Sequence, residues 1–168
     1  MISTNPIQLR QANESDAPIL LAVLHAAFEE YRGRLDPPSG VHAETIESVQ
    51  SKLKTSTAVI AFVGAEAAGC VFYEQKSTHL YLGRLSVLPQ FRKLGVGRAL
   101  IDYVEAQAAN LKVHSVQLGV RIALPQLKAY YEKLGYHIVS YETHPGYTKP
   151  TYVMMEKDVK QGPLNNGK

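Results

Sequence analysis

Three features common in other classes of protein are scarce in this sequence. It has one cysteine in 168 residues, so no internal disulfide can form and a reducing compartment is indicated. No apolar run approaches the roughly 20 residues of a membrane-spanning helix. Residues 1–6 contain neither the basic segment nor the apolar core of an export signal. We therefore expect a cytoplasmic protein that does not act at a membrane.

Strong charge and metal-ligand patterns are also missing. The net charge is only +3, and the basic residues are spread along the chain, which argues against a nucleic-acid partner. The six histidines lack zinc-ligand spacing, so we predict no metal site. A hydrophobic content of 45% over 168 residues instead indicates one soluble domain with a substantial core.

Apolar periodicity predicts seven strands and four helices in the order βααβββαβαββ. The strands are expected at 7–10, 58–63, 69–74, 80–87, 115–120, 136–141 and 152–159, and the helices at 17–31, 43–53, 96–111 and 125–134. The crossover through the third helix predicts one parallel strand pair in a mostly antiparallel, mixed α+β sheet. We assign residues 1–160 to a single domain and 161–168 to a flexible tail.

The most informative segment lies between an apolar strand and the third helix. A helix start leaves N–H groups unpaired and carries partial positive charge, and glycines let a bound anion approach closely. The segment therefore predicts a phosphate or pyrophosphate site, although two turn glycines at an ordinary helix start remain an alternative. It is neither a P-loop nor a complete dinucleotide fingerprint. Its sequence is Arg92-Lys93-Leu94-Gly95-Val96-Gly97-Arg98-Ala99.

The spacing Arg-x-x-Gly-x-Gly after Val87-Leu88-Pro89 resembles the acetyl-CoA turn of the GNAT superfamily of N-acetyltransferases. The segment Tyr131–Tyr136, one strand later, resembles that family's Tyr-x-Lys-x-Gly-Phe motif. The resemblance extends from Ile7 to Val159. It implies the GNAT fold, with a mixed, mostly antiparallel sheet of about seven strands, four helices and a splayed parallel strand pair.

The resemblance also implies where acetyl-CoA binds. The N–H groups of the turn would hold the pyrophosphate, and Arg92, Lys93 and Arg98 would add positive charge there, unless they form an ordinary solvated face. A bulge at Gly83 could lie near the pantetheine arm. The strand backbone would pair with that arm. The implied contacts are Leu85, Ser86, Val87, Arg92, Lys93, Leu94, Gly95, Val96, Gly97, Arg98 and Ala99.

The implied reaction moves an acetyl group from acetyl-CoA to a primary amine by direct attack. Tyr131 is the candidate general acid, because a phenol keeps its proton at neutral pH; aromatic packing beside Tyr130 is the alternative. The glutamate that some members carry on the fourth strand has no counterpart in Leu80–Arg84. Water could carry the proton from the amine instead. Side-chain candidates for the base are Glu30, Glu74, His79, Glu142 and His144.

The remaining expectations concern two individual residues, the acceptor and a competing function. Many relatives have an asparagine seven residues before the tyrosine, where this chain has Leu124. Cys70 is interpreted as a buried, inert strand residue. The acceptor is expected to be a small-molecule or peptide amine bound by the first two helices and by the loops 32–40 and 142–150, and a homodimer is possible. The competing hypothesis is a catalytically weak acyl-CoA-binding or regulatory module of the same fold.

Overall fold

The computed structural model describes residues 6–160 and forms two compact units. The first unit combines the chain up to Glu74 with Gly83–Tyr103, and the second combines Gln75–Leu82 with the chain from Val104 onward. The single domain expected from the sequence stays a prediction, and the predicted tail 161–168 lies outside the described residues.

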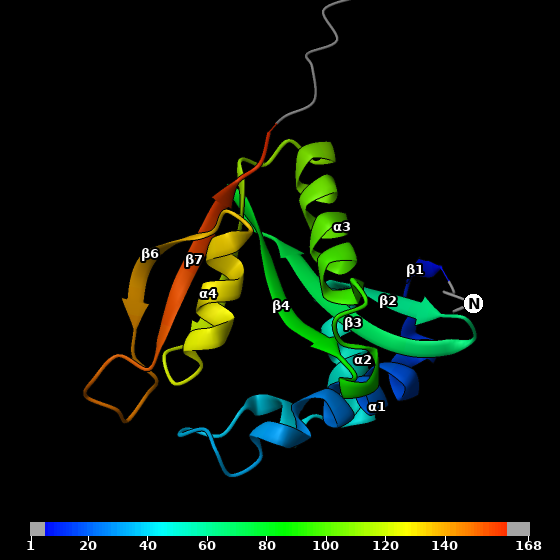
Figure 1. Cartoon of the computed structure of the whole chain (residues 1–168), viewed down its shortest axis with the longest axis horizontal. Helices are drawn as coiled ribbons and strands as arrows, with labels where there is room; N and C mark the ends of the chain where they lie inside the picture. Colours follow the sequence, from blue (N-terminus) through cyan, green and yellow to red (C-terminus); the bar gives the residue numbers. More distant parts are fainter. Residues whose placement is uncertain (1–5, 161–168) are drawn as a thin grey trace, which may run out of the picture. The chain divides into compact units, whose positions relative to one another are not determined.

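Seven strands and four α-helices occur in the predicted order (Figure 1). The strands are β1 (Ile7–Gln11), β2 (Thr57–Val63), β3 (Glu66–Gln75), β4 (His79–Val87), β5 (Ser115–Arg121), β6 (His137–Glu142) and β7 (Tyr152–Asp158). The helices are α1 (Ala17–Phe28), α2 (Ile46–Thr55), α3 (Val96–Asn110) and α4 (Pro125–Lys133). Short 3-10 turns are η1 (Glu14–Asp16), η2 (Glu29–Tyr31), η3 (Gly40–Ala43) and η4 (Pro89–Phe91).

The strand order is β1-β2-β3-β4-β5-β7-β6, which confirms the mixed, mostly antiparallel sheet. The predicted parallel pair is β4 with β5, and its ladder joins residues 79–81 to residues 115–117. β5 then pairs antiparallel with β7, and β7 pairs antiparallel with β6.

Two helix boundaries differ by three residues from the sequence-based expectation. The first α-helix ends at Phe28, and Glu29–Tyr31 continues as a 3-10 turn. The second begins at Ile46 rather than Ala43, because Thr45 and Ser48 form a reciprocal cap. The Thr45 hydroxyl accepts from the Ser48 N–H at 3.1 Å, and the Ser48 hydroxyl accepts from the Thr45 N–H at 2.8 Å.

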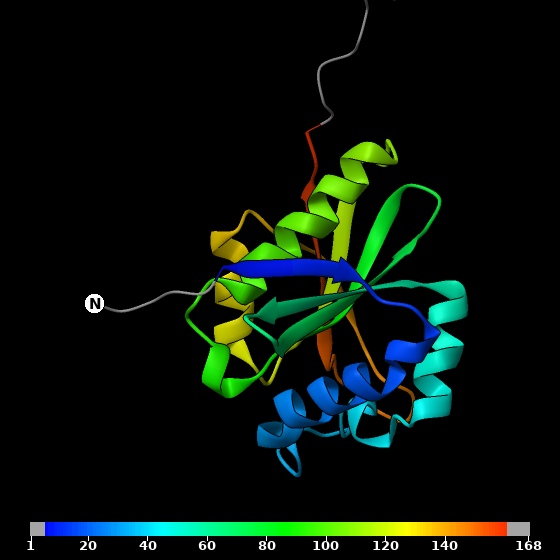
Figure 2. The same ribbon diagram turned by 90° about the vertical axis from the view of Figure 1, so that its right-hand side faces the viewer.

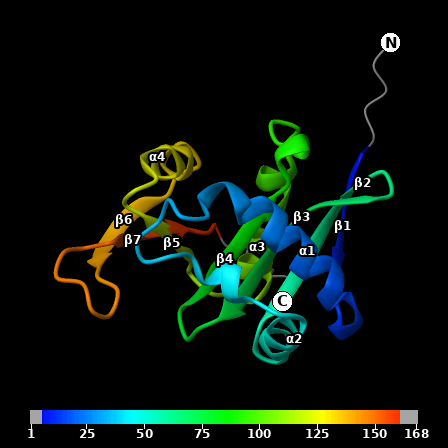
Figure 3. The same cartoon turned by 90° about the horizontal axis from the view of Figure 1, so that it is seen from below.

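The first unit has helices on both faces of its strands (Figure 2). One face of β2 and β3 presents Ala58, Ile60, Cys70 and Phe72 to a core shared with α1 and α2. These two helices also contact each other, as Figure 3 shows from below. The start of α3 packs on the opposite face, so this face of the strands supports the glycine turn.

Gly69 explains how closely the turn is held to the strands. A Cβ atom at this position would lie 2.5 Å from the Ser86 carbonyl oxygen and 3.0 Å from Val96 Cγ1. Any side chain would therefore push β3 away from the end of β4 or from the first turn of α3. A glycine in the middle of β3 is thus a packing requirement of the segment that follows it.

In the second unit, polar contacts join the middle of α3 to the last strands. Glu105 accepts a hydrogen bond from the Tyr136 hydroxyl at 2.9 Å and pairs with the Lys157 ammonium at 3.0 Å. The end of α4 is fixed by Gly135, whose φ of 100° follows the helix as the sequence predicted.

Candidate functional site

The glycine turn presents a row of main-chain donors. Lys93 and Gly95 have positive φ angles of 65° and 92°, which turn the chain sharply before α3. Ala99 makes the first bond back into the helix, from its N–H to the Gly95 carbonyl at 3.0 Å. Within residues 6–160, the N–H groups of 93–97 donate to no protein oxygen. Five consecutive donors at a helix start form a site suited to an anion.

Arg92, at the start of this turn, directs its guanidinium into the first unit. Its Nε donates to the Val87 carbonyl at 3.2 Å, Nη2 to the Ala27 carbonyl at 3.3 Å, and Nη1 to the Glu30 carboxylate at 2.9 Å. The hydrogen bond from Arg92 lowers the pKa of Glu30. Arg92 therefore ties the turn to the end of α1, and Glu30 matches its charge.

The two other cations of the turn are more exposed. Arg98 pairs with Asp102 one helical turn later at 3.0 Å, and both side chains are more than half exposed. Such an exposed pair contributes little to stability, because solvent screens both charges. Lys93 is exposed beside the free N–H groups. Their role at a bound phosphate stays a prediction.

β4 ends in an irregular segment just before the turn. The sequence placed a possible bulge at Gly83, and the structure puts the unusual backbone one residue later, where Arg84 has a φ of 55°. The Ser86 hydroxyl donates to the Arg84 carbonyl at 3.0 Å and is buried. Leu85 and Val87, the other predicted pantetheine contacts, are half-buried beside it. The two segments predicted to bind acetyl-CoA, 85–87 and 92–99, thus lie in the same unit.

Cys70 lies behind this segment and is fully buried. Burial raises the pKa of its thiol to about 12, against a smaller opposing effect of the Ser86 hydroxyl. A thiol with this pKa stays protonated at neutral pH and is a poor nucleophile. The structure therefore agrees with the interpretation of Cys70 as a packing residue.

Tyr131 lies in α4, in the second unit. Its side chain is buried, with edge-on contacts to Tyr130 and Tyr136 at centroid distances of 5.4 and 5.8 Å. Tyr130 is 38% exposed, so the two neighbouring tyrosines occupy different environments. Leu124, at the cap of α4, makes no side-chain capping bond. The packed ring of Tyr131 gives its hydroxyl a defined direction.

Two of the candidate bases make polar contacts that occupy their carboxylates. Glu30 pairs with Arg92, as described above. Glu142 accepts a hydrogen bond from the Ser140 hydroxyl at 2.7 Å. Of the other candidates, Glu74 lies near the end of β3, and the His79 ring contacts the Thr78 hydroxyl at 3.2 Å.

His144 has the most defined surroundings of the five candidates. Its main-chain N–H donates to the Thr151 hydroxyl at 3.0 Å, and its ring Nδ1 contacts the same hydroxyl. The ring also packs on Tyr152 at a centroid distance of 4.8 Å. Burial, together with the charge of Arg121, lowers the pKa of His144. A neutral imidazole at pH 7 is the protonation state that a base requires.

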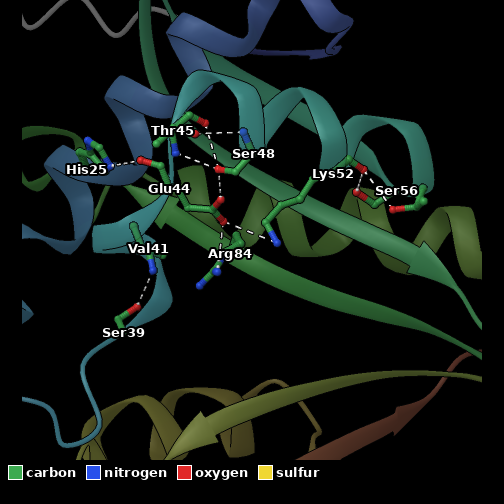
Figure 4. Close-up of polar contacts among 10 residues, drawn as sticks. His25, Ser39, Val41, Glu44, Thr45, Ser48, Lys52, Ser56 and Arg84 are labelled. Atoms are coloured by element: carbon green, nitrogen blue, oxygen red, sulfur yellow. Dashed lines mark hydrogen bonds and ion pairs between the residues drawn. The ribbon is translucent and has the colours of Figure 1, made fainter.

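A polar cluster that the sequence did not reveal lies in the first unit (Figure 4). At its centre is Glu44, whose side chain is only 5% exposed. Its Oε2 lies 3.1 Å from Arg84 Nη2 and 3.5 Å from Lys52 Nζ, and Ser48 donates a hydrogen bond to Oε1. The His25 ring contacts the Glu44 carbonyl at 3.2 Å. One signal was present: Arg84 is a charged residue directly after a glycine within the strand His79–Val87.

The comparisons with known proteins agree with this fold. The model of the acetyltransferase (GNAT) family matches residues 21–136. The chain belongs to the GNAT acetyltransferase family. A comparison with curated proteins gave no significant match.

Solved structures share the fold at low sequence identity. The PaiA N-acetyltransferase of Thermoplasma acidophilum, solved with coenzyme A, has a TM-score of 0.77 at 17% identity and covers 91% of this chain and 99% of its own. The ribosomal-protein-S18-alanine N-acetyltransferase of Escherichia coli has a TM-score of 0.75 at 16% identity, covering 95% and 98%. Ard1 of Thermoplasma volcanium has a TM-score of 0.73 at 19% identity, covering 92% and 99%.

Two features are absent from residues 6–160. Within this range no helix has both the length and the apolar character needed to cross a membrane. Over the same residues, His, Cys, Asp and Glu side chains do not gather in threes as metal ligands would.

Proposed function

We propose that this GNAT acetyltransferase moves an acetyl group from acetyl-CoA to a primary amine, and that the glycine turn holds the CoA pyrophosphate. The observation that carries the proposal is the row of N–H groups at 93–97 without protein partners. An anion there receives several main-chain hydrogen bonds and the positive end of α3. Membership of the acetyltransferase (GNAT) family supports acetyl-CoA as the source of that anion.

The other proposed contacts to acetyl-CoA come from side chains and from the main chain. Lys93 and Arg98 add positive charge around the pyrophosphate and the 3′-phosphate. Arg92 contributes by fixing the turn, since Glu30 already matches its charge. The backbone of Leu85–Val87 pairs with the pantetheine arm, as a strand pairs with a peptide. This contact uses main-chain atoms, so the missing asparagine at Leu124 costs one side-chain bond and leaves the rest.

The chemistry requires two proton movements. The neutral amine attacks the thioester carbonyl, a C–N bond forms, and the C–S bond breaks to release the CoA thiolate. Tyr131 donates its phenolic proton to that sulfur and is then reprotonated from solvent. The attacking nitrogen loses one proton, to water or to His144, whose lowered pKa leaves it able to accept.

The acceptor is a small-molecule or peptide amine. One structural neighbour is named for acetylating an alanine of a ribosomal protein, and another is an N-acetyltransferase solved with coenzyme A. We propose that α1, α2 and the loop 32–40, which belong to the first unit, bind the acceptor. These segments hold both charges and aromatic side chains, which allows a polar amine to be recognised.

A thiol-release assay tests the function directly. Purified protein is incubated with acetyl-CoA and a panel of amines, and free CoA thiol is measured over time. The proposal predicts amine-dependent release with formation of the N-acetyl product, detected by mass spectrometry. Tight CoA binding without turnover of any amine would contradict it and favour a CoA-binding module.

A further inference from the structure

The inference concerns the acceptor and rests on the proposed function. It begins with the backbone of Arg84, the only non-glycine residue in a described strand whose φ is positive. A side chain in this conformation is strained by about 1–2 kcal/mol, and such strain persists only where the surroundings enforce it. Arg84 directly precedes Leu85, where the proposed pantetheine-binding segment begins.

The guanidinium of Arg84 is held on one side by Glu44. The 3.1 Å contact between Nη2 and Oε2 is an ion pair to a carboxylate that is almost fully buried. Glu44 is itself fixed, because Ser48 donates to its other oxygen and Lys52 lies 3.5 Å from the same Oε2. The ion pair therefore holds the guanidinium beside Glu44, while Oε2 itself makes no hydrogen bond within residues 6–160.

Gly40 borders the guanidinium as well. A Cβ atom at Gly40 would lie 3.1 Å from Arg84 Nη2, closer than ordinary contact allows. The turn η3 therefore passes tightly along the guanidinium, and a glycine at this point leaves it room. Nearby, both ring nitrogens of His42 are enclosed and make no hydrogen bond within residues 6–160. The turn that contains Gly40 and His42 thus holds two buried ring nitrogens without a hydrogen-bond partner among the described residues.

The guanidinium still has unused donors and unbalanced charge. Within the described residues Nε and Nη1 of Arg84 make no hydrogen bond, and the side chain is 28% exposed. Two cations, Arg84 and Lys52, face the single negative charge of Glu44, so the cluster carries a net charge of +1. An oriented arginine with a free edge matches a planar carboxylate well.

We propose that Arg84 binds a carboxylate of the acceptor, so that the preferred substrates are amines that also carry a carboxylate. Glu44 acts as a positioning residue, which holds the guanidinium at the end of β4. Polyamines and other acceptors without an anionic group are disfavoured by the positive charge of Arg84 and Lys52.

The test compares matched acceptors in the acetyl-CoA assay. Amino acids with the amine at different distances from the carboxylate are paired with their amides, and kcat/KM is measured for each. The wild type is expected to prefer the acid of at least one pair by about ten- to a hundredfold, the size of a charge-assisted hydrogen bond. The comparison of each variant with the wild type cancels the different reactivities of the two amines.

Three variants separate the role of the guanidinium from that of general charge. Arg84→Asn removes the cation and places a residue that tolerates positive φ, and it should abolish the preference by raising KM for the acid. Arg84→Lys should retain part of it. Lys112→Asn, an exposed change outside the proposed site at a residue with a similar φ of 60°, should leave it unchanged. CoA affinity and the melting temperature, measured for each variant, show that it is folded.

The outcomes distinguish this inference from the proposed function. A wild type that acetylates amides and polyamines as well as acids overturns the inference and leaves the acetyltransferase in place. A folded Arg84→Asn variant with the wild-type preference also overturns it. Absence of turnover with every amine contradicts the proposed function itself, and the inference falls with it.

Discussion

The glycine turn and the Glu44 cluster lie in the same compact unit, but they present different kinds of atoms to a ligand. The turn offers main-chain N–H groups at 93–97, contributed by adjacent residues. The cluster offers the side chain of Arg84, oriented by Glu44, which lies 40 positions earlier in the sequence. The proposed acetyl-CoA site is therefore local in sequence, whereas the proposed acceptor site depends on packing between distant segments.

This difference predicts how each site responds to substitution. Truncating the side chain of Tyr131 or Arg84 should disturb catalysis or acceptor selectivity while leaving CoA binding nearly intact. CoA binding should be sensitive to changes that alter the backbone of the turn. The predictions below test that separation, beginning with the largest effect.

The substitution Tyr131→Phe should have the largest effect, and it should change only kcat. Loss of a general acid lowers kcat by about a hundred- to ten-thousandfold, whereas the ring that packs between Tyr130 and Tyr136 is retained. CoA affinity, measured by calorimetry, should remain within about twofold because the phenol is not part of the glycine turn.

Tyr130→Phe is the matched control, one residue away and more exposed. It should keep both kcat and CoA affinity. Equal rates for the Tyr131 variant and the wild type would show that another group, or water, protonates the sulfur.

Gly95→Ala should break the main-chain site. Its φ of 92° is disfavoured for alanine by about 1–2 kcal/mol, so the turn relaxes and CoA binding weakens by about tenfold. Gly33→Ala is the control, because Gly33 has a similar φ of 75° and no atom within 4 Å of the added Cβ. The control should lower stability by a similar amount and leave CoA affinity unchanged.

Arg92 and Glu30 provide a smaller test with a defined pH dependence. The hydrogen bond from Arg92 lowers the pKa of Glu30, so its contribution to stability is present above pH 4.5, the ordinary value. That contribution is lost as pH falls through the lowered folded-state pKa.

Chemical denaturation of Glu30→Gln and the wild type should therefore show a stability difference at pH 7 that disappears in strong acid. The difference should be modest, because both side chains are 38% exposed. A difference that grows as the pH falls would contradict the assignment of this pair.

The smallest expected effect is at Cys70. Its buried thiol, with a pKa of about 12, should resist a thiol reagent in the native protein and react after denaturation. Activity after exposure of the native protein to the reagent should match that of the untreated sample. Rapid labelling with loss of activity would show that the segment near Ser86 opens in solution.

The sequence predicted the features that depend on neighbouring residues. The element order followed from apolar periodicity, the glycine turn from its spacing, and the end of α4 from Gly135. The start of α2 was predicted three residues too early. The reciprocal cap between Thr45 and Ser48 sets this start, and it depends on side-chain rotamers. Family resemblance then assigned the turn to acetyl-CoA.

The Glu44 cluster could not be found in this way. Glu44, Lys52 and Arg84 come from separate elements, and their meeting depends on how α2 packs against the end of β4. No spacing rule relates residues that far apart. The positive φ of Arg84 was not predicted either, because the possible bulge was placed at the preceding residue, Gly83.

Hydrogen exchange of the glycine turn tests the central claim most directly. Residue-resolved amide exchange is measured with and without saturating CoA. We predict that the N–H groups of 93–97, which lack protein partners, exchange rapidly in the free protein and become strongly protected with CoA. The N–H of Gly33, in a separate loop, should not change. Amides of 93–97 that remain unprotected when CoA is bound would contradict the assignment of the turn as its pyrophosphate site.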